Sequence, residues 1–425
     1  MGEFDPGSSR REARRRQIRR RRFTAAVIAG LVLVAAIAGA WAARSSDEPQ
    51  TASSAQVENE SEAESAPSAT TTTEEEGDGG ETASAPPKPE KPSSKTKLVL
   101  RKTLGGDISP KSVESSGTGF VFAQNMMYRH SVTVYDAQTF ELRKTIPDSI
   151  ELADFGYERY SGTSLGAPVE AAFSPDGSYA YVSNYSMYGE GFGPEGDDGC
   201  TPSSGYDDSF VYRISLEMLE IDDAYRVGAV PKVVATTPDG RFVLVANWCT
   251  WDLSVISTKR GREVRRIPMG AYPRGIVVSE DGDVAYVAIM GGSTLVRVDL
   301  RTWKTSSIPI GSGPRALEIH PSGKWIYATL NAEGRVAKLN VRTGRVTKAS
   351  TGTLPRSLAM SEDAKALYVV NYESGTVSKL RTGDLKVLQT IPACYHPIGI
   401  TYDAPTRRVW VACYGGSLLV YNDRR

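Results

Sequence analysis

The hydrophobic positions of residues 272–311 fall into four short runs separated by Gly, Asp and Ser. The runs cover residues 276–278, 284–289, 295–298 and 304–310. They are rich in β-branched and aromatic residues, and turn-forming residues fill the gaps, which is typical of an antiparallel meander. This stretch therefore predicts four consecutive β-strands.

The same pattern recurs along the chain, and a proline precedes each copy. These anchor prolines are Pro110, Pro168, Pro231, Pro273, Pro314, Pro355 and Pro397, of which the last five are 41 or 42 residues apart. In the last six copies the second strand is expected to end sixteen residues after the proline, at Asn184, Asn247, Ile289, Leu330, Asn371 and Cys413. The copy at Pro110 is degenerate, and its third strand is expected at 131–136. One four-stranded unit cannot bury both of its faces, so seven units predict a closed ring of blades.

The two ends of the repeat region complement each other. The seventh unit has a third strand at 417–421 and then lacks a fourth strand, because the sequence stops at Arg425. Residues 98–104, LVLRKTL, match the fourth strand of the first unit, LRKTI at 142–146. An N-terminal strand that completes the last blade would close the ring and remove an exposed sheet edge. The predicted fold is therefore all-β, a seven-bladed β-propeller closed by an N-terminal strand.

Short motifs add a resemblance to this prediction. The sequences YVSNY at 181–185 and SPDG at 174–177, with the 41-residue period, resemble the YVTN-type β-propeller family, close to its YncE-like and surface-layer proteins. The resemblance covers residues 98–425. It implies the propeller fold, and it implies little about function because propellers carry many unrelated activities.

Three segments precede the predicted propeller domain at 97–425. Residues 1–23 are rich in arginine, and residues 24–43 form an uncharged run that, as a helix, would be about 30 Å long, the thickness of a bilayer's hydrocarbon core. Residues 44–96 are a low-complexity Ser/Thr/Pro/Glu-rich stretch, expected to be a disordered stalk. Basic and acidic residues number 50 each, so the net charge of zero hides the concentration of arginine at the N-terminus.

The arginine cluster predicts the orientation of the uncharged run in a membrane. Positive flanks stay in the cytoplasm, so the N-terminus is expected inside and the propeller outside the cell membrane. We expect one uncleaved transmembrane signal-anchor helix at 24–43, in a single-pass protein. A cleaved signal peptide with a site at Ala40-Trp41-Ala42 is the alternative, and it too places the propeller outside.

The four cysteines can form two disulfides, which suits a protein exported to an oxidising compartment. The expected disulfides are Cys200–Cys249 and Cys394–Cys413, although four cysteines allow three connectivities. We expect no metal site and no cofactor, because the sequence has neither CxxC nor a Cys/His cluster, and its three histidines are isolated.

The position after each anchor proline carries the strongest signal for a site. It is basic in five of seven units: Lys111, Lys232, Arg274, Arg315 and Arg356. Because strand 1 of a blade is innermost, these side chains are expected around the channel mouth, on the face that carries the long loops. Such a ring suits an anion such as phosphate, carboxylate or an acidic polymer. Alternatively the ring is a solvated funnel copied with the repeat, which Glu170 and Glu318 could neutralise.

Aromatic residues of the long loops form a second candidate group. The expected ligand-binding rim contains Tyr157, Tyr160, Tyr185, Trp248 and Trp251, to which His396, a single histidine in a loop, is added. Exposed rings there could stack on sugars or fill a pocket of a partner. The alternative is that Trp248 and Trp251 fold under the insertion at 189–208. The acidic residues of that insertion are expected to be a solvated loop rather than a calcium site.

These features predict a non-catalytic binding or scaffold module of the cell envelope. The expected partners are an envelope polymer or another extracytoplasmic protein, with no nucleic acid, and the propeller is expected to be monomeric. The alternative is a lactone hydrolase like those among similar propellers, acting on an anionic sugar lactone in the channel. Glu170 would then be the base, and Arg274 or Arg315 would hold the substrate.

Overall fold

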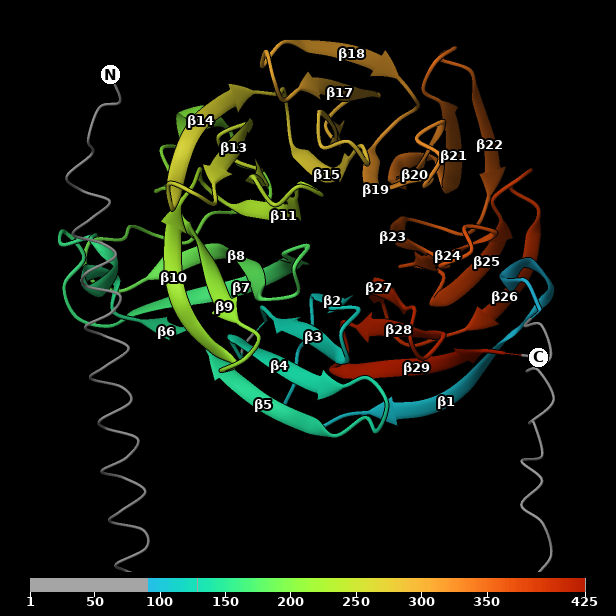
Figure 1. The fold of residues 1–425 in the computed structure, drawn as a ribbon, viewed down its shortest axis with the longest axis horizontal. Helices are drawn as coiled ribbons and strands as arrows, with labels where there is room; N and C mark the ends of the chain where they lie inside the picture. The colour runs from blue at the N-terminus through green and yellow to red at the C-terminus, as the bar shows by residue number, and fades with distance from the viewer. Residues whose placement is uncertain (1–90, 128, 425) are drawn as a thin grey trace, which may run out of the picture. The chain divides into compact units, whose positions relative to one another are not determined.

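A computed structural model describes residues 91–127 and 129–424, which fold as seven sheets arranged around a central axis (Figure 1). In each sheet the strand that contains or directly follows an anchor proline lies nearest the axis, and the strands after it lie progressively outward (Figure 1). Helical structure in this part of the chain is limited to short 3₁₀ turns: η1 (Ser93–Lys95), η2 (Leu152–Phe155), η3 (Pro202–Ser204) and η4 (Asn331–Glu333). The all-β, seven-bladed propeller is confirmed.

The blades are numbered in chain order, and their strands follow the predicted repeats. Blade 1 contains β2 (Ser112–Ser115), β3 (Phe120–Asn125), β4 (Ser131–Asp136) and β5 (Leu142–Pro147). Blade 2 contains β6 (Ser149–Ile150), β7 (Ser164–Phe173), β8 (Tyr179–Tyr188), β9 (Phe210–Ser215) and β10 (Glu220–Arg226). Blade 3 contains β11 (Pro231–Thr236), β12 (Phe242–Asn247), β13 (Asp252–Ser257) and β14 (Arg262–Pro268).

The remaining blades keep the four-stranded plan. Blade 4 contains β15 (Pro273–Val278), β16 (Val284–Ile289), β17 (Thr294–Asp299) and β18 (Thr305–Pro309). Blade 5 contains β19 (Pro314–Ile319), β20 (Trp325–Leu330), β21 (Arg335–Asn340) and β22 (Val346–Ser350). Blade 6 contains β23 (Pro355–Met360), β24 (Ala366–Asn371), β25 (Thr376–Arg381) and β26 (Val387–Pro392). Blade 7 contains β27 (Pro397–Asp403), β28 (Arg408–Cys413), β29 (Ser417–Asp423) and β1 (Leu98–Leu104).

The N-terminal strand β1 is the outer strand of blade 7, as the sequence predicts. It pairs antiparallel with β29, from Leu98 opposite Asp423 to Leu104 opposite Leu418 (Figure 1). The first and last strands of the propeller therefore share one sheet. This pairing covers the edge of β29 and closes the ring.

The residues just before β1 also belong to the folded unit, which begins at Lys91 and not at residue 97. The Ser93 backbone N–H donates to Asp363 Oδ2 at 2.9 Å. The Thr96 hydroxyl donates to Asp423 Oδ1 at 2.8 Å. These contacts fasten the chain to blades 6 and 7 before the strand begins.

Apolar clusters fill every interface between neighbouring blades in the described part of the chain. Blades 3 and 4, for example, meet through Leu244 and Val255 on one side and Val287 and Val298 on the other. Burying one such side chain contributes about 1.5–3 kcal/mol. The core is therefore a series of layers around the ring, which makes the channel walls rigid.

Blade 2 departs from the predicted repeat. Strand β8 continues to Tyr188, beyond the predicted end at Asn184, because β7 also starts early and pairs with it. The short β6 adds a fifth strand to the sheet. The loop before β7 and the insertion after β8 thus extend one sheet outward, and the repeat pattern contained no signal for this.

Within residues 91–127 and 129–424, no helix is both long and apolar enough to cross a membrane. The expected basic tail at 1–23, the anchor at 24–43 and all but the end of the stalk at 44–96 lie outside the described residues.

Candidate functional site

Four of the five basic residues after the anchor prolines, all except Lys111, lie at register shifts of the innermost strands. In blades 3, 4 and 5 the pairing of strands 1 and 2 shifts register just after the proline, at the position of Lys232, Arg274 and Arg315 respectively. A bulge redirects the side chains of the strand that carries it. The repeat thus delivers one basic side chain from each of these three blades to the same level of the channel.

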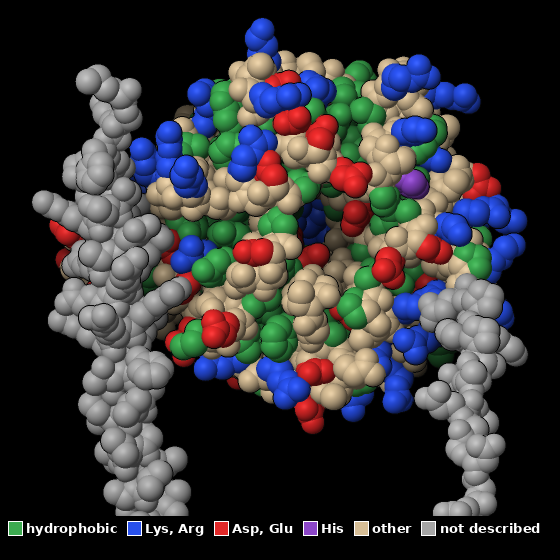
Figure 2. Space-filling view, in the orientation of Figure 1, with side chains coloured by type: hydrophobic (Ala, Val, Ile, Leu, Met, Phe, Trp, Pro, Cys, Tyr) green, Lys and Arg blue, Asp and Glu red, His purple; other side chains and the backbone are tan. Residues whose placement is uncertain are grey.

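These cations line a real cavity. A channel pocket of about 410 Å³ is lined by Arg274, Arg315 and Arg356 together with the carboxyl groups of Glu114, Glu170 and Glu318. Figure 2 shows the central opening, with Lys or Arg side chains visible inside it. Lys232, Arg274 and Arg315 are buried, whereas Lys111 and Arg356 are partly exposed.

Four of the five cations have a partner within the propeller. Arg274 Nη2 lies 3.4 Å from Glu170 Oε1, and Lys232 Nζ lies 2.8 Å from Asp198 Oδ1. The Arg356 guanidinium stacks 3.6 Å above the ring of Tyr372. Lys111 Nζ lies 5.4 Å from the ring of Tyr414. These contacts offset part of the mutual repulsion in the ring.

Arg315 is different. It is 6 % exposed, yet its side chain has no hydrogen-bond or ion-pair partner among the described residues. Burial, followed by the charges of Arg274 and Arg356, lowers the pKa of Arg315. Glu170 and Asp198 act in the opposite direction without contacting the guanidinium, so the cost of burying this charge is offset only in part.

The pKa values of Lys111 and Lys232, two other cations of the mouth, are lowered as well. Burial, followed by the charges of Lys232 and Arg315, lowers the pKa of Lys111. Burial lowers the pKa of Lys232 to about 7, although Asp198 acts in the opposite direction. The cations of the mouth therefore repel one another, and Glu170, which lies against Arg274, offsets only part of that repulsion.

The glutamates of the channel favour their protonated forms. Burial raises the pKa of Glu318 to about 8. Burial also raises the pKa of Glu114, with further contributions from Glu318 and Glu170. For Glu170 burial is again the largest effect, and Arg274 opposes it. Glu318 can therefore exchange a proton near neutral pH, where an ordinary glutamate cannot.

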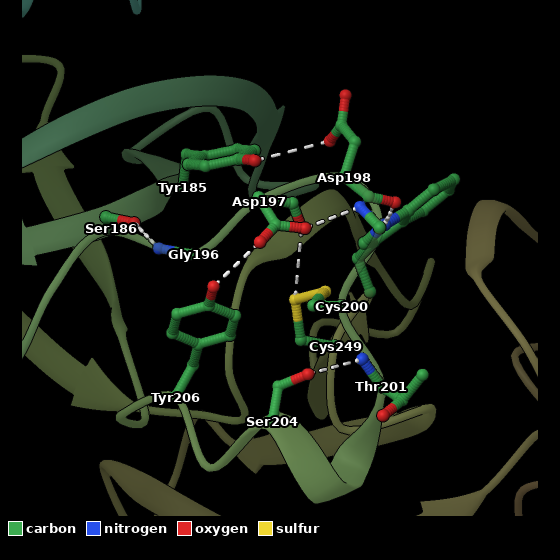
Figure 3. The surroundings of a disulfide bond; sticks show 12 residues. Tyr185, Ser186, Gly196, Asp197, Asp198, Cys200, Thr201, Ser204, Tyr206 and Cys249 are labelled. Atoms are coloured by element: carbon green, nitrogen blue, oxygen red, sulfur yellow. Dashed lines mark hydrogen bonds between the residues drawn. A yellow bond between two sulfur atoms is a disulfide. The ribbon is translucent and has the colours of Figure 1, made fainter.

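Both expected disulfides are confirmed. Cys200–Cys249 joins the insertion of blade 2 to the loop after β12, and Cys394–Cys413 lies within blade 7. With the paired cysteines 49 and 19 positions apart, chain entropy alone gives about 4 and about 3 kcal/mol of stabilisation. Figure 3 shows the first bridge below Tyr185 of β8 and the insertion residues Asp197 and Asp198.

The aromatic rim differs from the expectation of exposed rings. Tyr160, Tyr185 and Trp248 are buried, so the prediction that they are exposed is wrong. Large rings gain most by packing, and here they support the insertion: Tyr160 stacks on Phe192, and the Trp248 indole donates to the Asp198 carbonyl at 3.1 Å. The alternative that Trp248 folds under the insertion is the one observed.

The other two aromatic candidates are partly buried. The Tyr157 hydroxyl donates to the Ala224 carbonyl at 3.4 Å and accepts from the Arg226 N–H at 3.2 Å. Trp251 packs edge-on against Tyr272, with ring centres 5.7 Å apart. Both side chains therefore hold blades and loops together.

A second aromatic group, which sequence reasoning missed, lies beside the mouth in blades 6 and 7. Tyr395 is 69 % exposed and stacks on His396, with ring centres 3.8 Å apart. His396 stacks in turn on Tyr372 at 4.0 Å, the ring that carries Arg356. His396 Nε2 lies 3.6 Å from Glu373 Oε2. The candidate residue His396 is therefore part of a stack that runs from solvent to a cation of the mouth.

The repeat contains the signal that could have identified this group. Tyr185, Trp248, Tyr372 and Tyr414 all follow the last residue of the repeat's second strand, seventeen residues after the anchor proline. Each of these rings lies under a basic residue of the mouth, with Lys232 over both Tyr185 and Trp248. In four blades the residue at this position is therefore aromatic and lies next to a basic residue of the mouth.

In the described part of the chain, no group of three or more His, Cys, Asp or Glu residues could hold a metal ion. Among the acidic residues of the insertion, Asp198 and Asp208 pair with Lys232 and Arg266, whereas Asp197 makes local contacts. Asp197 accepts from the Gly199 N–H at 2.7 Å and from the Tyr206 hydroxyl at 2.7 Å.

Known proteins resemble this chain in fold alone. Hydrazine synthase of Kuenenia stuttgartiensis matches with a TM-score of 0.58 and 18 % sequence identity, over 74 % of this chain and 96 % of that chain. At this identity the likeness concerns the fold and carries no activity. Neither protein-family models nor curated protein sequences gave a match.

Proposed function

We propose that this protein is a membrane-anchored extracytoplasmic β-propeller that binds an anionic ligand at the basic mouth of its channel, without catalysis. The observation that carries the proposal is Arg315, a guanidinium that is 6 % exposed and has no side-chain partner among the described residues. An anion in the channel would supply the missing partner, and Arg is suited to a bidentate contact with carboxylate or phosphate.

The surroundings of Arg315 favour an anion for a second reason. The charges of Arg274 and Arg356 act on Arg315, and both of these arginines also act on Lys111; burial lowers the pKa of each of the three arginines. Bound negative charge would relieve all of these interactions at once. In a cavity that is screened little by salt, such an effect is larger than at an exposed surface.

The proposed location and family rest on other features. Two disulfides in the described residues suit an oxidising compartment. The uncharged run at 24–43, after an arginine-rich tail, suits an anchor that places the propeller outside the cell. We further propose membership of the YVTN-type propeller family, which the repeat period and the motifs support. The partner would be an acidic envelope polymer or an extracytoplasmic protein with exposed carboxylates.

A hydrolase of an anionic sugar lactone is the second candidate. It is favoured by Glu170 and Arg274, a carboxyl and a guanidinium 3.4 Å apart in the channel. Burial raises the pKa of Glu170, however, and a general base must be ionised to accept a proton. We therefore rank binding before hydrolysis.

The test is binding of the full chain to poly(glycerol phosphate) and polygalacturonate, with lactone turnover followed in parallel. Arg315→Met removes the unpaired charge and keeps much of the side-chain volume. It is expected to weaken binding at least tenfold and to raise the melting temperature, because a costly buried charge is lost. Arg345→Met removes the same charge from an exposed turn between β21 and β22 and should change neither quantity.

The combination of the two readouts decides the proposal. Weaker binding together with higher stability identifies a group kept for a ligand. Lower stability with unchanged binding would make Arg315 a structural residue and would refute the proposal. Turnover that disappears in Glu170→Gln would support the hydrolase instead.

A further inference from the structure

Asp198 is the acidic residue of the insertion that contacts the basic mouth. Its Oδ1 lies 2.8 Å from Lys232 Nζ and accepts from the Tyr185 hydroxyl at 3.3 Å. Its backbone carbonyl accepts from the Trp248 indole at 3.1 Å. Lys232 Nζ lies over the rings of Tyr185 and Trp248, at 4.1 and 5.2 Å from their centres. Lys232 is thus enclosed by two rings and capped by one carboxylate.

The two members of this ion pair differ greatly in exposure. The Lys232 side chain is 4 % exposed, whereas the Asp198 side chain is 73 % exposed. The carboxylate therefore lies between solvent and the ammonium group. Any other anion that is to reach Lys232 must take the place of Asp198.

The charge of Asp198 extends beyond Lys232. It acts on Arg274, Arg315 and Arg356 as well. Burial raises the pKa of Asp198, but Lys232 and the other cations outweigh it and lower the pKa to about 2. Asp198 is therefore a permanent negative charge beside the mouth.

The insertion holds Asp198 there from both sides. Cys200, two residues later, is bonded to Cys249, and Asp197, one residue earlier, is turned away toward Tyr206 (Figure 3). Of these two adjacent aspartates, one contacts the mouth and the other folds its own loop. The arrangement offers a matched pair of carboxylates for experiment.

We propose that Asp198 is a specificity-determining residue, a built-in anion that an external ligand must displace from Lys232. This inference rests on the proposed binding of anions at the mouth. A ligand with one anionic group only exchanges one carboxylate contact for another. A ligand with several such groups can also be held by Arg315 and Arg356, so it depends less on Lys232, and Asp198 therefore selects for polyanions.

The test uses the full chain at pH 6, below the pKa of about 7 of Lys232, with acetate as the single carboxylate and citrate as the polyanion. Removing the competitor strengthens binding at Lys232 by the fraction of protein that becomes competent, and acetate depends on Lys232 more than citrate does, because citrate also binds Arg315 and Arg356. Asp198→Asn is expected to strengthen acetate binding about tenfold and citrate binding about threefold. The preference for citrate should therefore decrease. Asp197→Asn makes the same change of charge at the neighbouring residue and should alter both affinities less than about twofold.

A ligand-independent readout accompanies the titrations. Loss of the capping carboxylate should lower the pKa of the Lys232 ammonium further, which ¹³C NMR of the labelled Lys232 side chain measures directly. Asp198→Glu, which keeps the charge, should retain the wild-type preference for citrate. If Asp198→Asn does not fold, the comparison of Asp198→Glu with the wild type still tests the role of the charge.

The outcomes separate this inference from the proposed function. An unchanged ratio of acetate to citrate affinity in Asp198→Asn, or weaker binding of both, would overturn the role of Asp198 and leave the mouth an anion site. If wild type and Asp198→Asn bind neither anion while folded, the proposed function is itself wrong and this inference is refuted with it.

Discussion

The side chains of Lys379 and Asp423 form an ion pair with no solvent exposure on either side, and it joins blade 6 to the last residue of β29. The pair is fully satisfied. Asp423 also accepts from Thr96 and Tyr368, and Lys379 donates to the Thr96 carbonyl at 3.0 Å. This network fastens the N-terminal segment, the C-terminal strand and blade 6 to one another.

We predict that Asp423→Ala lowers the free energy of unfolding by about 3–5 kcal/mol, because it leaves a buried ammonium without its carboxylate. Chemical denaturation of the full chain measures the effect. The double change Lys379→Met with Asp423→Leu should be clearly more stable than Asp423→Ala, because apolar groups replace both charges. A double variant as unstable as the single one would contradict this account.

A fragment that starts at residue 97 should be less stable than one that starts at residue 91. The shorter fragment lacks Ser93 and Thr96, whose contacts with Asp363 and Asp423 are partly or fully buried. Losing several such hydrogen bonds costs about 2–4 kcal/mol in total. Thermal unfolding of the two fragments checks this. Equal melting temperatures would show that the contacts of Ser93 and Thr96 do not stabilise the propeller. Deleting residues 98–104 should be more damaging still.

Ala364→Gly is expected to stabilise the protein by about 0.5–1 kcal/mol. Ala364 has φ of 51°, in the turn between β23 and β24 where blades 2 to 5 have glycine with φ of 66–72°. Glycine adopts this left-handed conformation without the cost of a Cβ atom. The reverse change, Gly323→Ala in blade 5, has open space for the methyl group and should destabilise through backbone conformation alone. A lower melting temperature for Ala364→Gly would mean that the buried methyl group matters more.

The buried carboxyl of Glu318 makes stability depend on pH. Its pKa is raised from 4.5 to about 8, so between these values the folded state binds more protons than the unfolded state. Stability is therefore expected to fall as pH rises from 4.5 to 8, and Glu318→Gln should remove this part of the fall. Denaturant unfolding at pH 5 and pH 8 measures it. Glu280→Gln, in an exposed turn, should leave the pH profile unchanged. An identical profile for Glu318→Gln would contradict the effect of burial.

The repeat predicted those features that every blade shares. The anchor prolines, the ends of most second strands, the closure by residues 98–104 and the basic position after each proline follow from local pattern and copying. The pairing of Cys200 with Cys249 and of Cys394 with Cys413 followed from cysteines in neighbouring loops. These are short-range or periodic signals, which a sequence states directly.

Features that depend on packing between loops could not be predicted. No local signal distinguishes Asp198, which contacts Lys232, from Asp197, which folds its own loop. Nor does the sequence show that Tyr160 is buried while Tyr395 is exposed, because both are tyrosines in polar loops. Their positions follow from how the insertion packs on the rim, and that is decided by contacts far apart in sequence.

Closure of the ring by β1 and β29 sets the order of events during synthesis. β1 is the first strand of the propeller to be made, and β29, its partner, is the last. Until residues 417–423 emerge, β1 has no partner and blade 7 cannot form, even if the earlier blades have already folded. The two apolar layers that blade 7 shares with blades 6 and 1 stay open for the same time. A nascent chain therefore remains an open arc, with unpaired edges, until translation of the whole domain is complete.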